Sequence, residues 1–273
     1  MIMKTIALIV ALAATTAIAA PEFYVMDNCV GRGSWTPNQQ AKTLKELGYA
    51  GISYNYTKPE DLAAWQKAFK EQGLKIYGLY AHTALDPAKP YDPRLPEAIK
   101  LLKGTGTVLW LTVQASKTPG NHDELAVKTL QQLADLAAAS DVRCALYGHA
   151  GFYVATSADS ARMAAKVQRP NLTATLNLCH EFLSGNADKL DATIKEVAPV
   201  ATMATINGID VANKKYLLRL DQGDFEMAAY LKKLTAAGYR GPIGLQCYSV
   251  PGDVKENLVA NLAAWRKLAT DLK

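Results

Sequence analysis

The sequence predicts a single α/β domain of the (β/α)8 barrel type. Eight short runs rich in β-branched and aromatic residues alternate with segments of helical period, a pattern typical of repeated strand and helix units around a parallel sheet. Residues 20–273 suit the length of eight such units, and no linker or low-complexity segment divides them. An open, doubly wound sheet is the structural alternative. The predicted strands are Phe23 to Asn28, Gly51 to Tyr56, Lys75 to Thr83, Thr107 to Val113, Arg143 to His149, Asn171 to His180, Val200 to Asn207 and Pro242 to Tyr248.

The segments between these strands carry signals for helix ends. Thr36, Pro37 and Gln39 offer a hydroxyl N-cap, a proline in the first turn and the glutamine of a capping box. Gly48 and Gly238 each follow a helical segment and precede a strand, where a left-handed residue ends a helix well. This recurrence favours a repeated unit.

The first 19 residues have the pattern of a signal peptide. Lys4 precedes an apolar run, and Ala17, Ile18 and Ala19 supply the small-residue site that a signal peptidase cleaves. We therefore assign residues 1–19 to a signal peptide and residues 20–273 to the barrel domain, and we expect an exported protein, periplasmic or extracellular. No later stretch has the roughly 18 apolar residues of a membrane span, so we expect no membrane association.

The charge of the chain gives no sign of a nucleic-acid partner. The formal net charge is +5 at pH 7, and the basic residues are dispersed, with no stripe of basic and aromatic residues. The sequence does not indicate an oligomeric state.

Four cysteines are far apart in the chain, and closure of a barrel would bring the first and last strands together, which suggests a Cys29–Cys247 disulfide.

Polar residues gather at the predicted carboxyl ends of the strands, where the loops of a (β/α)8 barrel build the active site. Three of the four histidines belong to this set. A single such histidine is more often a structural hydrogen-bonding group, but three at one rim favour a site. The aromatic and amide groups suit a sugar, whereas Trp110 is interpreted as core. The expected substrate-binding residues are Asn28, Tyr54, His82, Tyr147, Asn177, Asn207, Gln246 and Tyr248.

The fifth to eighth strand ends read Ala-Leu-Tyr147-Gly-His149, Asn177-Leu-Cys-His180-Glu181, Ile206-Asn207-Gly208-Ile209-Asp210 and Gly-Leu-Gln246-Cys-Tyr. This series resembles the xylose isomerase-like TIM barrels, a family of sugar isomerases, epimerases and related lyases with endonuclease IV as a relative. The resemblance implies a divalent ion held by a glutamate, an aspartate, a histidine and a second glutamate on strands five to eight. It also implies that the two glutamates move a proton beside a substrate carbonyl.

The chain departs from that pattern at each ligand position. Tyr147, Asn177 and Gln246 stand where the two glutamates and the aspartate would be, and the histidine of strand seven has no counterpart. His180 matches a family histidine that contacts substrate. Because neutral amides are not bases, the family's proton shuttle cannot operate unchanged.

A different set of groups, His149, His180 and Glu181, is therefore the candidate catalytic set. These residues could act as acids and bases directly. His149 and Glu181, with Gln246, could instead hold a divalent metal such as Mn, Zn or Mg. Glu181 is equally consistent with a structural salt bridge.

The sequence thus favours an exported sugar isomerase or epimerase that removes a proton next to a carbonyl of a small carbohydrate. A carbohydrate-binding barrel without catalytic activity is the main alternative, because the family's metal ligands are replaced. Metal-dependent phosphodiester hydrolysis is disfavoured, since that chemistry uses more metal ligands than this site offers.

Overall fold

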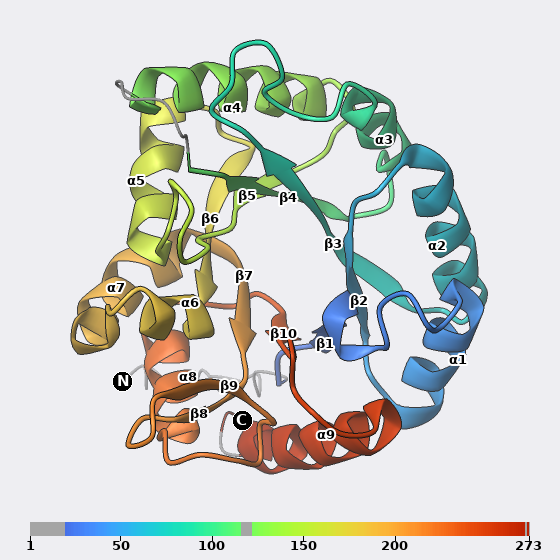
Figure 1. The fold of residues 1–273 in the computed structure, drawn as a ribbon, viewed down its shortest axis with the longest axis vertical. Coiled ribbons are helices and arrows are strands. Elements are labelled where there is room, and N and C mark those ends of the chain that lie inside the picture. The colour runs from blue at the N-terminus through green and yellow to red at the C-terminus, as the bar shows by residue number, and fades with distance from the viewer. Residues whose placement is uncertain (1–19, 116–121, 271, 273) are drawn as a thin grey trace, which may run out of the picture.

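The structure is a computed structural model that describes residues 20–115, 122–270 and 272. Eight parallel strands close into a barrel in the order β1-β10-β7-β6-β5-β4-β3-β2, and helices surround it (Figure 1). Because β1 pairs with both β2 and β10, the sheet has no open edge. This confirms the predicted (β/α)8 barrel and contradicts the open-sheet alternative. The predicted signal peptide lies outside the described residues.

The strands of the barrel are β1 (Phe23–Met26), β2 (Gly51–Asn55), β3 (Lys75–Thr83), β4 (Val108–Val113), β5 (Cys144–Leu146), β6 (Leu172–Asn177), β7 (Ala201–Ile206) and β10 (Ile243–Leu245). The helices are α1 (Pro37–Leu47), α2 (Pro59–Glu71), α3 (Leu95–Leu101), α4 (His122–Ala138), α5 (Ser157–Val167), α6 (Leu178–Leu183), α7 (Leu190–Val197), α8 (Met227–Ala236) and α9 (Val254–Thr270). Three short 3-10 helices span Asp27–Cys29, Ala187–Lys189 and Ala198–Val200.

Several strands end earlier than the sequence predicts. β6 stops at Asn177, and the chain turns at once into α6, so His180 and Glu181 lie on a helix and not on a strand. β5 and β10 also end before Tyr147 and Gln246. After β7, the two-stranded antiparallel sheet of β8 (Gly208–Asp210) and β9 (Lys215–Leu218) lies between the seventh and eighth predicted strands, where no strand is predicted. Tyr147, His180 and Gln246 therefore belong to turns and a short helix rather than to the strands themselves.

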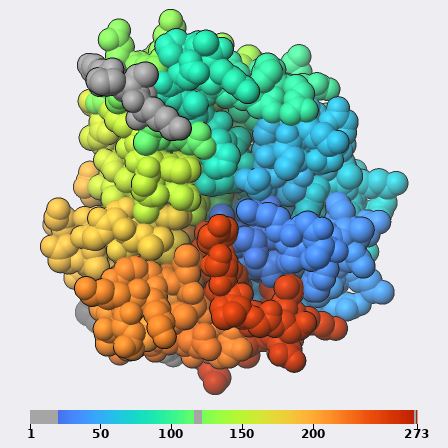
Figure 2. All heavy atoms as spheres, viewed as in Figure 1, coloured from blue at the N-terminus to red at the C-terminus, as the bar shows by residue number. Residues whose placement is uncertain are grey.

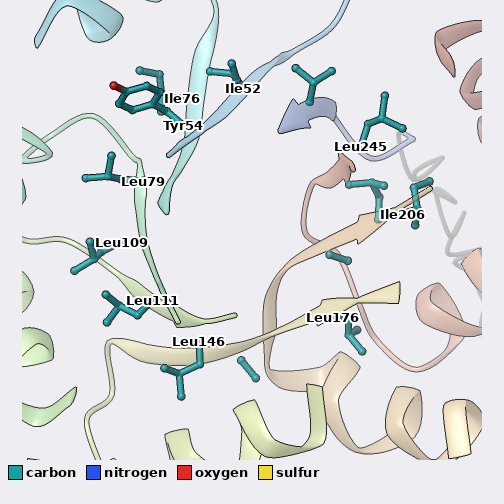
Figure 3. Close-up of a cluster of buried hydrophobic side chains, with 14 of the residues drawn as sticks. Ile52, Tyr54, Ile76, Leu79, Leu109, Leu111, Leu146, Leu176, Ile206 and Leu245 are labelled. Carbon is teal, nitrogen blue, oxygen red and sulfur yellow. The ribbon is translucent and has the colours of Figure 1, made fainter. Parts of the chain in front are cut away.

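The core has two layers because successive strand residues point to opposite sides of the sheet. The outer layer fills the space between the barrel and its helices, and Figure 3 shows some of its side chains around the strands, among them Leu146, Leu176 and Leu245. The inner layer fills the barrel and includes Trp110, which is fully buried and donates from Nε1 to Thr175 at 3.3 Å. The assignment of Trp110 to the core is confirmed.

The local helix signals are present as expected. Thr36 and Gln39 form the predicted capping box at the start of α1, and Gly48 ends that helix in the left-handed region with φ of 98°. None of the described helices combines the length and apolarity needed to cross a bilayer.

Candidate functional site

A cavity of about 430 Å³ opens at the carboxyl ends of the strands, a size within the usual range of small-molecule sites. We call it the inner cavity. Figure 2 shows this face of the molecule, where residues that follow β1 meet the loop that follows β10. Seven of the predicted site residues line the inner cavity: Asn28, His82, Tyr147, His149, His180, Gln246 and Tyr248.

Backbone N–H groups fix the orientation of the two amide side chains in this cavity. The N–H of Cys247 donates to Oδ1 of Asn28 at 3.1 Å, so the Asn28 Nδ2 must face the other way, and it donates to Oε1 of Gln246. The N–H of Tyr248 also donates to that Oε1, at 3.2 Å. The Nε2 of Gln246 is left to donate to the hydroxyl of Tyr147, at 3.4 Å.

The tautomer of His180 is fixed in the same way. The N–H of Ala150 donates to Nδ1 of His180 at 3.2 Å, so the ring proton of the neutral imidazole lies on Nε2, which is 2.9 Å from the Tyr147 hydroxyl. Burial, together with nearby His149, lowers the pKa of His180 to about 3. His180 is therefore neutral at physiological pH and donates to Tyr147.

The hydroxyl of Tyr147 thus accepts hydrogen bonds from both His180 and Gln246. Burial raises the pKa of Tyr147 well above its usual value, so the phenol keeps its proton. With both donors pointing at its oxygen, the proton of Tyr147 is free to be donated to a ligand in the inner cavity, which this side chain lines.

His149 offers the complementary group, an acceptor. Its Nδ1 lies 2.9 Å from the carbonyl oxygen of Ala150, so Nδ1 carries the proton and Nε2 carries the lone pair. The ring lies between Phe152 and His180, with centroids 4.1 and 4.2 Å away, which restricts its rotation. Burial lowers the pKa of His149. The side chain is therefore a neutral imidazole with a basic nitrogen, and none of the described residues forms a hydrogen bond to that Nε2.

Two further features place these groups. Gly148 allows the chain between Tyr147 and His149 to lie directly on the start of α5, because a Cβ there would be 2.5 Å from the backbone of Thr156.

His82 stands on the rim with its Nδ1 2.9 Å from the hydroxyl of Thr112, and it supplies a second imidazole to the inner cavity.

The structure places three predicted substrate-binding residues outside the inner cavity. Tyr54 points outward into the layer under α2, as Figure 3 shows, and packs on Trp65. Asn177 lies inside the barrel, where Gly148, Thr175 and Thr205 satisfy its amide. Asn207 is fully buried and donates to the carbonyl oxygens of Gly208 and Tyr216.

Glu181 also lies away from the inner cavity, because α6 turns its side chain toward α5. One carboxylate oxygen accepts the N–H of Ser157 in the first turn of α5 at 2.7 Å, and the other accepts Nδ2 of Asn186 at 2.6 Å. The side chain is 1% exposed. Glu181 thus joins two helices and does not line the inner cavity.

The predicted metal ligands His149, Glu181 and Gln246 do not converge. Glu181 faces α5, and the amide oxygen of Gln246 already accepts two hydrogen bonds. Within the described ranges, no group of three or more His, Cys, Asp or Glu side chains is arranged to hold a metal ion. The residues present therefore do not fit the divalent ion that the family resemblance implies.

A charged pair at the edge of the cavity is not among the site residues predicted from the sequence. Asp27, which is 5% exposed, forms a salt bridge with Arg32 and accepts the backbone N–H of Asn55 at 3.1 Å. All three residues line the inner cavity. The sequence signal for Asp27 as a site residue was its position directly before Asn28, at the end of the first predicted strand.

The predicted Cys29–Cys247 disulfide is not formed, and all four cysteines are free and buried. The two residues are nevertheless neighbours, as barrel closure implies, because the backbone N–H of Cys247 and the Cys29 thiol both donate to Asn28. Burial and the adjacent Cys247 thiol raise the pKa of Cys29.

Comparisons with known proteins agree with this architecture. The sequence profile of the xylose isomerase-like TIM barrel matches residues 41–268. No curated protein sequence gives a significant match. Among solved structures, the 3-keto-D-glucoside 4-epimerase YcjR from E. coli is similar with a TM-score of 0.74 and 14% identity, covering 90% of this chain and 99% of that chain.

Two other solved structures have the same fold. The D-allulose 3-epimerase from Methylomonas sp. in complex with D-allulose has a TM-score of 0.71 and 18% identity, with 92% of this chain and 99% of that chain covered. The IolI protein, with a bound zinc atom, has a TM-score of 0.70 and 14% identity, with 91% and 98% covered. This chain belongs to the xylose isomerase-like TIM barrel family.

Proposed function

We propose that this protein is an exported sugar isomerase or epimerase that removes a proton from the carbon next to a substrate carbonyl without a metal ion. The observation that carries the proposal is the arrangement of a hydrogen-bond donor, Tyr147, and a base, His149, on one cavity wall. The named activities of the similar structures, two of them sugar epimerases, support the substrate class.

In this mechanism His149 accepts the carbon-bound proton at Nε2. The electron pair of the C–H bond moves into the new double bond of the enediol, and the carbonyl oxygen gains the negative charge. The Tyr147 hydroxyl donates to that oxygen, and its geometry is set before the substrate arrives because His180 and Gln246 hold it. The proton of the adjacent hydroxyl then passes to the former carbonyl oxygen, so that the adjacent oxygen forms the new C=O bond. His149 returns its proton to the former carbonyl carbon, and the product is an isomer.

Epimerisation at the same carbon needs a proton from the opposite face of the enediol. His82 supplies a second imidazole in the inner cavity for that step. The neutral polar wall formed by Asn28, Gln246 and Tyr248 suits sugar hydroxyls, which need paired donors and acceptors.

Deuterium exchange tests the proposal. Purified protein is incubated in D2O with aldoses, ketoses and 3-keto sugars, and deuterium at carbon is measured by NMR and mass spectrometry. We expect exchange into at least one class, with loss of about 10²-fold or more in His149→Gln, in the range of general base catalysis. The matched control is His122→Gln, a histidine on α4 outside the cavity.

Two results would argue against the proposal. Unchanged exchange in His149→Gln would remove His149 as the base. Sugar binding with no exchange in any class would favour the alternative of a non-catalytic carbohydrate-binding barrel, which the neutral residues at the former ligand positions also suit.

A further inference from the structure

A second cavity adjoins the inner one. It has a volume of about 460 Å³ and lies between the loop after β1, the start of α1 and the start of α2. We call it the outer cavity. Asp27, Arg32 and Asn55 line both cavities, so these three residues form the partition between them.

Two side chains of the partition have groups that a ligand can bind. The Arg32 side chain is 47% exposed and is anchored through its salt bridge to Asp27. Asn55 is held through its backbone N–H, and none of the described residues forms a hydrogen bond with its side-chain amide. A linking oxygen or hydroxyl that crosses between the cavities would therefore meet both a cationic donor and a free amide.

The walls of the outer cavity combine aromatic rings with polar groups. Trp35 and Trp65 supply aromatic surface, and C–H groups of a sugar ring pack well on such surface. Thr57 donates to Oδ2 of Asp61 at 2.6 Å, and Nζ of Lys58 lies 3.7 Å from Oδ1. The Asp61 side chain is 41% exposed, so its remaining lone pairs can accept from hydroxyl groups. With Arg32 already paired to Asp27, this lining favours a neutral polyol over a phosphate.

Gln40 adds an independent sign that a ligand donor belongs here. Its side chain lines the outer cavity and is 1% exposed, and its Nε2 donates to the carbonyl oxygen of Trp35 at 3.1 Å. Its Oε1 is buried and has no hydrogen-bond partner among the described residues. A buried acceptor without a partner costs about 1–3 kcal/mol, and a sugar hydroxyl would satisfy it.

We propose that the outer cavity is a second sugar-binding subsite and that the substrate has at least two rings, as in a disaccharide or glycoside. This inference rests on the proposed function for the ring in the inner cavity. The reacting ring lies beside Tyr147 and His149, the second ring lies against Trp35, and the glycosidic linkage passes Arg32 and Asn55.

The test compares matched sugars. Affinities are measured by isothermal titration for D-glucose and D-fructose, and for the disaccharides cellobiose, maltose and lactulose that contain them. We expect at least one disaccharide to bind 10-fold or more tightly than its monosaccharide. Trp35→Ala should remove that preference while monosaccharide affinity stays within 3-fold, and Trp35→Phe, which keeps a ring, should retain most of it.

A substitution at Gln40 gives a second measurement in which the Trp35 ring is kept. Gln40→Met replaces the amide with a side chain of similar length, removes both the buried acceptor and the hydrogen bond from Nε2 to the Trp35 carbonyl oxygen, and should reduce the disaccharide preference alone. The proposal is overturned if disaccharides bind no more tightly than monosaccharides, or if both substitutions weaken the two classes equally.

Deuterium exchange separates this test from that of the proposed function. Exchange into a monosaccharide without a disaccharide preference would refute the subsite and leave the enzymatic proposal standing. A disaccharide preference without exchange into any sugar would support the subsite and refute the enzymatic proposal.

Discussion

Replacement of Tyr147 by phenylalanine is the most direct test of the hydrogen-bond arrangement in the inner cavity. The change removes one oxygen and leaves the ring, which packs against Tyr80 and Trp110, in place. It also removes the common acceptor of His180 and Gln246. The substitution should therefore affect both the reaction and the stability of the fold, by amounts that the structure allows us to estimate.

The effect on the reaction follows from the loss of one donor to the developing oxyanion. Removal of a single donor of this kind costs about 10²–10³ in rate, or about 3–4 kcal/mol. Since Tyr147 donates more strongly as charge develops on the carbonyl oxygen, most of the loss should fall on kcat rather than on KM. Steady-state kinetics on the sugar with the fastest deuterium exchange measures this split.

The effect on stability follows from the donors left without an acceptor. His180 is 5% exposed, so its Nε2–H would be buried without a partner, at a cost of about 1–3 kcal/mol. Gln246 is held at the longer distance of 3.4 Å, so the loss of this weaker hydrogen bond should add little. Urea denaturation measures the sum.

Tyr49→Phe is the matched control. It removes a buried tyrosine hydroxyl that donates to the carbonyl oxygen of Leu258 at 2.8 Å, away from the inner cavity. It should lower stability by about 1 kcal/mol and leave kcat/KM unchanged. If Tyr147→Phe keeps kcat/KM within 3-fold of the wild type, the role of Tyr147 as the donor to the substrate carbonyl is refuted.

Four other outcomes follow from the structure. Glu181→Gln should lower the melting temperature, because the carboxylate caps the start of α5, but a loss of kcat/KM above 10-fold in folded protein would restore a catalytic role for Glu181. Dialysis against EDTA should leave the exchange rate unchanged, because the groups at the family's ligand positions are neutral and already hydrogen-bonded within the protein, and activation by added Mn²⁺ would contradict this. Between about pH 6.5 and pH 3, His180 carries a proton in the unfolded chain but not in the folded one, so this residue alone should lower the free energy of unfolding by about 1.4 kcal/mol per pH unit of acidification. Urea denaturation should show a shallower slope in His180→Gln, and equal slopes would be inconsistent with the buried neutral ring. Protein recovered from the periplasm or medium should begin at Ala20 by intact mass, whereas retention of Met1 would argue against the predicted cleavage.

The barrel could be predicted because its signals are local and repeated. Capping residues such as Thr36 and helix-ending glycines such as Gly48 act within a few residues, and the apolar periods mark each element. The sequence also placed most of the inner cavity correctly, since parallel strands bring their carboxyl ends to one rim. Those inferences need only the order of the elements.

The alternation of side chains along a strand does not determine where Tyr54 and Asn177 lie in the barrel. Alternation separates Ser53 and Asn55 from Tyr54, but it does not say which set faces inward, and packing on Trp65 draws Tyr54 outward. Asn177 does face inward, but it lies one layer below the cavity, where Thr205 and Gly148 satisfy it. Depth along a barrel axis is set by strand register, which no single strand specifies.

The catalytic hypothesis depends on directions of hydrogen bonds rather than on residue types. Asn28, Tyr147, His180 and Gln246 can each donate and accept, so their identities alone allow many networks. The backbone N–H groups beside them remove this freedom: those of Cys247 and Tyr248 turn the two amides, and that of Ala150 sets the imidazole. Because each of these N–H groups forces a donor toward the next side chain, the chain of bonds ends at one oxygen, and the proton of Tyr147 is left for the substrate. The neutral residues at the family's ligand positions thereby orient the Tyr147 hydroxyl as a hydrogen-bond donor to the substrate. The orientation of the two amides depends on backbone positions that come together only when β10 pairs with β1 and closes the barrel.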